Sequence, residues 1–374
     1  MKGGTLPLLG LATLLLSAWS ARAAEWHVHK HQGRDYVTFR NVAEFYRFSD
    51  YQQANRTVSL RSDRRGVRAQ ADKSELYING VRFFTHFPIV TQNNESMISA
   101  IDVGKIVEPI LRPSRIDNAQ KVETVILDPG HGGTDTGGSN RWGSEKEFTL
   151  HVAATAREQL LRAGFKVEMT RTADSGISLE ERIEFANRIP NAVFVSIHFN
   201  SGTGGNGVES YALTPEGLPS STGGSHHAAA AANGPETHEG NHQDAQNISL
   251  TAAVHASVLS RLSAHDRGVR HARFKVLRHI RIPAVLIEAG FMSDPVEGQR
   301  IATAQYRQQL GMAIAQGVQN YNAAVNYRTQ DAGFTIVRTN LPPHSRPITE
   351  PLDVNQPLPP LAPHEPSISI TPGG

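Results

Sequence analysis

The sequence contains no cysteine, and this absence limits the chemistry that the protein can perform. Disulfide bonds, thiolate metal ligands, a cysteine nucleophile and a lipid-modified N-terminal cysteine are all excluded. Any metal ion must therefore be bound by histidine, aspartate or glutamate side chains.

The N-terminal apolar run is too short to cross a membrane. It extends over Leu6–Ala18, whereas a membrane-spanning helix needs roughly 20 apolar residues. The run follows Lys2 and precedes Ala21-Arg22-Ala23, which has the small-x-small pattern of a signal peptidase site. Residues 1–23 are therefore predicted to be a signal peptide. We expect an exported protein, periplasmic or in the extracellular cell wall, with no stable membrane span after signal removal.

An excess of charge of either sign is also missing. The chain has 37 basic and 35 acidic residues, and two of the basic ones, Lys2 and Arg22, lie in the predicted signal peptide. Removal of the signal peptide leaves a formally neutral protein, which gives no support for binding to nucleic acid or to an anionic membrane by bulk charge. We therefore expect no nucleic-acid partner.

Residues 24–118 have the pattern of a small β-rich module. Short alternating stretches such as Val58-Ser59-Leu60 are divided by polar turns. Asn79-Gly80 lies between two apolar stretches and is typical of a two-residue hairpin turn, because both residues tolerate a positive φ. The module resembles the stalk-type N-terminal modules of copper amine oxidases and of bacterial wall proteins. That likeness implies contact with the wall or with a partner.

Residues 119–327 have the alternating apolar runs and amphipathic segments of an α/β domain. A capping-box pattern at Ser178 and Glu181 and the terminating Gly164 mark helix ends. The expected strands are Val122–Leu127, Lys166–Thr170, Ala192–His198, Val208–Leu213 and Ala284–Ile287, and the expected helices are Glu145–Ala163, Ser178–Arg188, Ile248–Leu262 and Tyr306–Tyr321. The predicted fold is a mixed sheet with helices on both faces, preceded by the small β-rich module.

Two segments of the chain depart from this pattern. Residues 214–244 are rich in Gly, Ser, Ala and His with little periodicity, and they are predicted to be an insertion. We hypothesise that this insertion modulates access to the site. Residues 328–374 are rich in proline, which removes backbone donors, and they are predicted to form a largely disordered tail.

Four side chains at the ends of predicted elements form a candidate zinc site. His131 follows the first strand of the domain, His198 and Glu288 close two further strands, and Glu145 opens a helix after a glycine-rich loop. Ligands bind at the carboxyl ends of strands in open α/β sheets, so these groups can converge. Two imidazoles and one carboxylate leave a fourth zinc position for water, and a second carboxylate would move the proton.

Each of these residues also has an ordinary structural interpretation. A histidine at a strand end is commonly a hydrogen-bonded surface residue, and a glutamate at a helix start commonly interacts with the helix dipole. Glu147 lies two positions after Glu145 and is an alternative ligand. Glu288 ends an apolar run and would need a partner if it were buried.

A second metal pattern, His238-Glu239-Gly240-Asn241-His242, matches the H-E-x-x-H string of zinc peptidases. That string requires a regular helix, and Gly240 and Asn241 are poor helix formers. No glutamate follows Glu239 until Glu288, so a third ligand close downstream is missing. This segment is interpreted as histidine-rich rather than catalytic.

The distributed motifs resemble those of the zinc-dependent N-acetylmuramoyl-L-alanine amidases of the type-3 amidase family. The resemblance spans almost all of residues 122–325. The motifs are Ile126-Leu127-Asp128-Pro129-Gly130-His131-Gly132-Gly133, Glu145-Lys146-Glu147, Thr170-Arg171-Thr172-Ala173-Asp174, Ser196-Ile197-His198-Phe199-Asn200-Ser201 and Val285-Leu286-Ile287-Glu288-Ala289-Gly290-Phe291.

This resemblance implies a role for each matching residue. His131, Glu145 and His198 would bind Zn²⁺, and Glu288 would be the catalytic glutamate, the general base and acid for a zinc-bound water. Further matching positions, interpreted as supports of the crevice, are Arg171, Arg182 and Asn187.

The implied substrate is peptidoglycan, cut at the amide between N-acetylmuramic acid and L-alanine of the stem peptide. Some members of the family place a regulatory helix over the zinc, which adds the expectation of an activator protein acting on the insertion at 214–244. Two alternatives are a zinc endopeptidase that uses His238 and His242, and a catalytically silent wall-binding protein.

Overall fold

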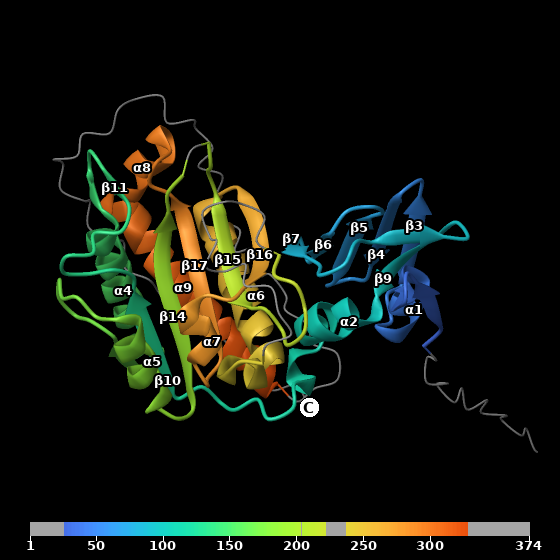
Figure 1. Ribbon diagram of the computed structural model, residues 1–374, viewed down its shortest axis with the longest axis horizontal. Helices are drawn as coiled ribbons and strands as arrows, with labels where there is room; N and C mark the ends of the chain where they lie inside the picture. The colour runs from blue at the N-terminus through green and yellow to red at the C-terminus, as the bar shows by residue number, and fades with distance from the viewer. Residues whose placement is uncertain (1–25, 203, 222–236, 328–374) are drawn as a thin grey trace, which may run out of the picture.

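The structure is a computed structural model that describes residues 26–202, 204–221 and 237–327. The predicted signal peptide, the predicted tail and the middle of the predicted insertion lie outside these residues. The described part is built around a sheet of 11 strands in the order β13-β10-β14-β17-β15-β16-β7-β6-β5-β4-β3 (Figure 1). None of the helices in these described ranges is long and apolar enough to cross a membrane.

The part of the sheet beyond residue 119 mixes strand directions. Strands β13, β10, β14 and β17 are parallel, β15 is antiparallel to β17, and β16 is parallel to β15. The strands are β10 (Thr124–Pro129), β13 (Lys166–Met169), β14 (Ala192–Asn200), β15 (Val208–Leu213), β16 (Asp266–Ala272) and β17 (Ala284–Phe291), with a small pair of β11 (Ser139–Asn140) and β12 (Gly143–Ser144) outside the sheet.

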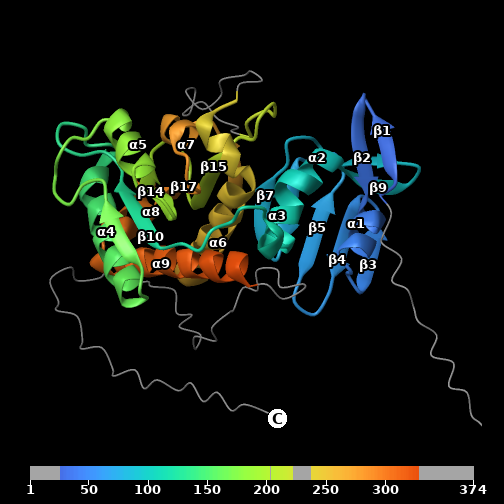
Figure 2. The same ribbon diagram turned by 90° about the horizontal axis from the view of Figure 1, so that it is seen from below.

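Helices cover both faces of this mixed sheet, so the predicted fold class is confirmed (Figure 2). One face packs on α4 (Glu145–Arg162), α6 (Asp244–Leu262), α8 (Pro295–Ile301) and α9 (Ala304–Asn326), and the other packs on α5 (Leu179–Asn187) and α7 (Lys275–His279). Alternate residues of each strand enter the two cores: Val285 and Ile287 face the first set of helices, and Leu286 faces the second.

The β-rich N-terminal module contains helices as well as strands. Its strands are β1 (Val28–His31), β2 (Arg34–Thr38), β3 (Asp50–Ala54), β4 (Thr57–Arg61), β5 (Gly66–Gln70), β6 (Glu75–Ile78), β7 (Val81–Phe84), β8 (Val90–Gln92) and β9 (Glu95–Ser99). Helix α1 (Phe39–Phe45) and the helical segment of α2 (Ala100–Asp102), η1 (Val103–Val107) and α3 (Glu108–Leu111), followed by η2 (Pro113–Arg115), were not expected. The predicted Asn79-Gly80 hairpin is confirmed, because both residues have positive φ between β6 and β7.

The module is joined to the rest of the protein through the sheet itself. Strand β7 pairs with β16 at Phe83 and Val269, so the strands of the module extend the central sheet. Both residues enter a core that also contains Ile248 and Ala252 of α6. The sequence pattern does not reveal this pairing, because it joins residues that are far apart along the chain.

Several predicted elements differ from the observed ones at their ends. Strands β14 and β17 continue beyond His198 and Glu288, so the prediction that these two residues close their strands is wrong. The extension is stabilised by pairing between the two strands, where Asn200 lies opposite Phe291. Strand β16 and helices α7 and α8 were not expected, and their short patterns carry little periodicity of their own.

Candidate metal centre

His131 is placed by a tight turn that follows β10. Its backbone is left-handed, with φ of 62°, and the next two glycines also have positive φ. Two arginine side chains stabilise this turn by hydrogen bonds to its carbonyl groups. Arg171 donates to the carbonyls of Pro129 and Gly130, and Arg182 donates to those of Pro129 and His131. Backbone carbonyls that would be unpaired at the end of the strand therefore have charged donors.

A buried ion pair anchors the same turn. Asp128 and Arg182 are 1% and 3% exposed, and they pair directly. The Asp128 carboxylate also accepts hydrogen bonds from the hydroxyl groups of Thr170 and Ser196, at 2.7 and 2.8 Å. The aspartate on β10 thus links this strand to β14 and to the residue that follows β13.

Replacement of Arg182 by methionine is expected to lower the free energy of unfolding by about 3–5 kcal/mol, because the buried Asp128 carboxylate loses its cation. Urea unfolding measures this change. The matched control is Arg188→Met, which removes an exposed arginine paired with Glu184 and should have little effect. Equal losses in the two variants would show that Asp128 does not depend on its buried partner.

Glu145 is the first residue of α4, and the alternative ligand Glu147 faces elsewhere. The Glu147 carboxylate closes a capping box by accepting from the backbone N–H of Ser144 at 3.2 Å. Glu145 is 3% exposed and points toward the histidines instead. The glycine loop allows this approach, because a Cβ on Gly137 would lie 2.5 Å from both the Glu145 carboxylate and the His131 ring.

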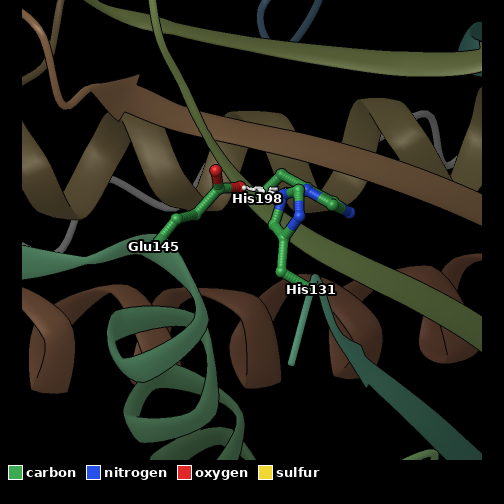
Figure 3. Close-up of side chains that lie close together, drawn as sticks. All are labelled: His131, Glu145 and His198. Atoms are coloured by element: carbon green, nitrogen blue, oxygen red, sulfur yellow. Dashed lines mark hydrogen bonds and ion pairs between the residues drawn. The ribbon is translucent and has the colours of Figure 1, made fainter. Parts of the chain in front are cut away.

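The side chains of His131, Glu145 and His198 converge (Figure 3), and their ligand atoms all lie within 4.8 Å of one another. Glu145 Oε1 lies 3.1 Å from His131 Nε2 and 3.0 Å from His198 Nδ1. Ligands about 2.0–2.1 Å from a tetrahedral zinc ion are about 3.3 Å apart. The two imidazoles and the carboxylate therefore lie close enough together to hold a metal ion.

Further hydrogen bonds orient these three groups, as partners of metal ligands commonly do. The other nitrogen of His131, Nδ1, lies 2.8 Å from a carboxylate oxygen of Asp135. Glu145 accepts from the backbone N–H groups of Gly138 and Phe199, at 2.8 and 3.0 Å. Asp135 was not predicted from the sequence, although a carboxylate four residues after a candidate histidine ligand could have indicated such a partner.

The electrostatics of the cluster favour a cation. Burial acts to raise the pKa of Glu145, but the hydrogen bonds and positive charges of His131 and His198 outweigh burial and lower it. Burial acts to lower the pKa of His131, and the carboxylates of Glu145 and Asp135 outweigh it and raise that pKa. The Glu145 carboxylate is thus held ionised beside the two imidazole rings.

Glu288 lies beside this cluster on β17. It is directly opposite His198 on β14 and opposite Glu209 on β15, so the three side chains share one face of the sheet. Its Oε2 atom is buried with no hydrogen-bond partner among the described residues. Burial, followed by the negative charges of Glu145 and Glu209, raises the pKa of Glu288 well above the usual value of a glutamate.

A pocket of about 670 Å³ opens over these residues. Its floor contains the three converging side chains and Glu288, and its wall includes Leu179 at the start of α5 and Lys275 on α7. A molecule bound in this pocket would contact the candidate metal ligands and Glu288 together.

The remaining predicted residues lie away from the pocket floor. His238 directly precedes the 3₁₀ helix η4 (Glu239–Gln243), and His242 lies within it. Residues four apart in a 3₁₀ helix do not share a face. Among the described residues, the only group of three or more candidate ligands is the one at His131. Asn187 bonds to the carbonyl of His279 and the N–H of Arg281, so it supports the segment after α7 rather than the His131 turn.

Comparisons with known proteins agree on one family. The profile of the family described as N-acetylmuramoyl-L-alanine amidase matches residues 125–320. The amidase CwlM of Bacillus licheniformis is 31% identical over 217 residues, which cover 56% of this chain and 75% of that protein. The amidase AmiA of Escherichia coli (strain K12) is 32% identical over 219 residues, covering 53% and 75%.

Solved structures were compared as well. The crystal structure of an N-acetylmuramoyl-L-alanine amidase from Clostridium difficile 630 is 31% identical, with a TM-score of 0.43, and the match covers 54% of this chain and 97% of that one. The amidase AmiC2 of Nostoc punctiforme is 30% identical with a TM-score of 0.44, covering 55% and 98%.

Proposed function

The chain belongs to the N-acetylmuramoyl-L-alanine amidase family, and from this premise we propose which of its residues carry the reaction. The protein is a peptidoglycan hydrolase that acts on the amide between N-acetylmuramic acid and L-alanine of the stem peptide. The observation that supports the assignment of residues is the convergence of His131, Glu145 and His198 beside Glu288.

We propose that the metal is zinc and that His131, Glu145 and His198 hold it. The spacing of the two imidazole nitrogens and the Glu145 oxygen supports this choice, as does the absence of cysteine, which leaves histidine and carboxylate ligands. When bound, zinc supplies Lewis acidity, which activates water and polarises the carbonyl of the amide.

Glu288 is proposed to move the proton. Its carboxylate accepts a proton from the attacking water, and the same proton then passes to the nitrogen of L-alanine as the carbon–nitrogen bond breaks. Burial and the unpaired Oε2 support this role, because that oxygen has no other hydrogen bond to give up. Asp135 orients His131, and Arg182 holds the turn on which His131 lies.

The substrate lies in the cell wall, so the enzyme acts as an exported protein. We propose that residues 1–23 direct this export, that 24–118 form a module contacting the wall or a partner, and that 328–374 form a tail.

An activator acting on the insertion at 214–244 is a further proposal. Its described C-terminal part, η4, contacts α7, and Lys275 and Val276 of α7 line the pocket. A partner bound to η4 would therefore act on the pocket wall through one helix.

Mass analysis of the products from purified peptidoglycan tests the proposed reaction. The expected products are stem peptides with a free L-alanine amino group and glycan strands with a free lactyl carboxylate. Cleavage inside the stem peptide would support the endopeptidase alternative that uses His238 and His242. No cleavage by protein with a full complement of zinc would support the silent wall-binding alternative.

A further inference from the structure

Glu209 lies at the centre of a buried polar cluster next to the pocket. It is 4% exposed on β15 and directly opposite Glu288 in the antiparallel pair of β15 and β17. Side chains at such opposite positions have Cβ atoms about 4.5–5.5 Å apart and project from the same face of the sheet. Two carboxylates therefore stand side by side, although only one of them belongs to the proposed reaction.

The two carboxylates have very different partners. Glu209 Oε2 pairs with Arg267 Nε at 3.1 Å and with Arg270 Nε at 3.3 Å. Its other oxygen, Oε1, accepts from the side-chain amide of Asn200 at 2.7 Å and from the hydroxyl of Tyr211 at 3.0 Å. The Oε2 atom of Glu288, in contrast, is buried and has no hydrogen-bond partner among the described residues.

The two arginines come from β16, the strand on the far side of β15 from Glu288. Neighbouring strands lie about 4.8 Å apart, and an arginine side chain is long enough to extend past one strand. Once it is ionised, an unpaired buried carboxylate attracts a cation strongly, because the attraction is weakly screened away from water. Glu209 lies between Glu288 and this nearby source of positive charge.

We propose that Glu209 is a positioning residue that holds Arg267 and Arg270 away from Glu288 and so keeps that carboxylate free for the proton. The proposal rests on the general-base role of Glu288. Without Glu209, a guanidinium would pair with Glu288 and occupy the oxygen atoms that must accept the proton from water.

The ordinary alternative is that Glu209 only satisfies buried polar groups and fixes Asn200. Glutamine at position 209 separates the two roles. Its amide oxygen keeps the hydrogen bonds from Asn200 and Tyr211, whereas the negative charge that binds the arginines is lost. If Glu209 is a positioning residue, removal of the two arginines should restore the catalytic activity that Glu209→Gln has lost.

The test compares steady-state kinetics of zinc-loaded Glu209→Gln with those of the triple variant Glu209→Gln/Arg267→Gln/Arg270→Gln. We expect the single change to lower kcat by about 10²-fold with little change in KM, and the triple variant to recover at least about tenfold of that loss. A crystal structure of Glu209→Gln is expected to show a guanidinium group within hydrogen-bond distance of Glu288. The control is Glu75→Gln, which removes another carboxylate paired with an arginine, Arg82, and should leave kcat unchanged.

Two results would overturn the proposal. The first is full activity of Glu209→Gln, and the second is an inactive single variant whose loss the triple variant does not recover although it folds and binds zinc. Glu288→Gln measured in the same assay separates this proposal from the proposed function. If Glu288→Gln is active, the assignment of the base fails whatever Glu209 does.

Discussion

Glu288→Gln is expected to lower kcat by two to four orders of magnitude, which is the usual contribution of a positioned general base. Glutamine has nearly the same shape as glutamate, so the buried side chain still fits, but its amide cannot accept and return a proton at neutral pH. The zinc content should stay at the wild-type level, because Glu288 is outside the group of converging ligands. Single-turnover release of L-alanine amino groups and elemental analysis measure the two quantities.

A matched control for this variant is Glu184→Gln, which removes an exposed carboxylate on α5. Both variants lose one carboxylate, so a general effect of net charge would lower both rates. Retention of more than about a tenth of the wild-type rate by Glu288→Gln would contradict its assignment as the base.

His198→Ala is expected to weaken zinc binding by more than about 100-fold, and activity should disappear with the metal. Even the loss of a residue that only orients a ligand commonly weakens metal binding by about 10- to 100-fold, so the loss of a ligand itself should exceed that. His198 also supplies one of the two imidazole contacts to Glu145 Oε1, at 3.0 Å. Competition with a chelator of known affinity measures the zinc affinity of the variant.

The matched controls are His238→Ala and His242→Ala, at the histidines of the H-E-x-x-H string. Both should keep zinc and activity, because η4 does not place the two side chains on one face. If His238→Ala loses zinc while His198→Ala keeps it, the metal centre has been assigned to the wrong histidines. Glu147→Gln should also keep its zinc, since glutamine preserves the capping box.

Features that depend on near neighbours in the chain could be predicted from the sequence. The capping box at Ser178, the hairpin at Asn79-Gly80 and the bounds of β15 follow from local backbone preferences and from period-two patterns. The end of α4 before Gly164 is of the same kind. Such features are fixed within a few residues, so a single sequence contains the information that determines them.

The strand ends and junctions that the sequence pattern did not predict depend on pairing between strands that are far apart in the chain. Strand β17 continues past Glu288 because β14 pairs with it as far as Phe291, and its local sequence does not show where that pairing stops. The junction of β7 with β16 is similar, since it joins segments almost two hundred positions apart. The hydrogen bonds of a strand depend on which other strand lies next to it in the sheet, and that neighbour is determined only when the chain folds.

For the metal centre, the residue types could be predicted from the sequence alone, and the family motifs pointed to His131, Glu145 and His198. Only the tertiary structure brought these three within 4.8 Å, turned Glu147 into a cap and set Glu145 between the two rings. It also placed Glu209, which pairs with Arg267 and Arg270, opposite Glu288, and no spacing in the sequence indicated this. The physical reason is that the absence of cysteine restricts which atoms can bind a metal, whereas sheet register and the paths of tight turns decide where those atoms meet.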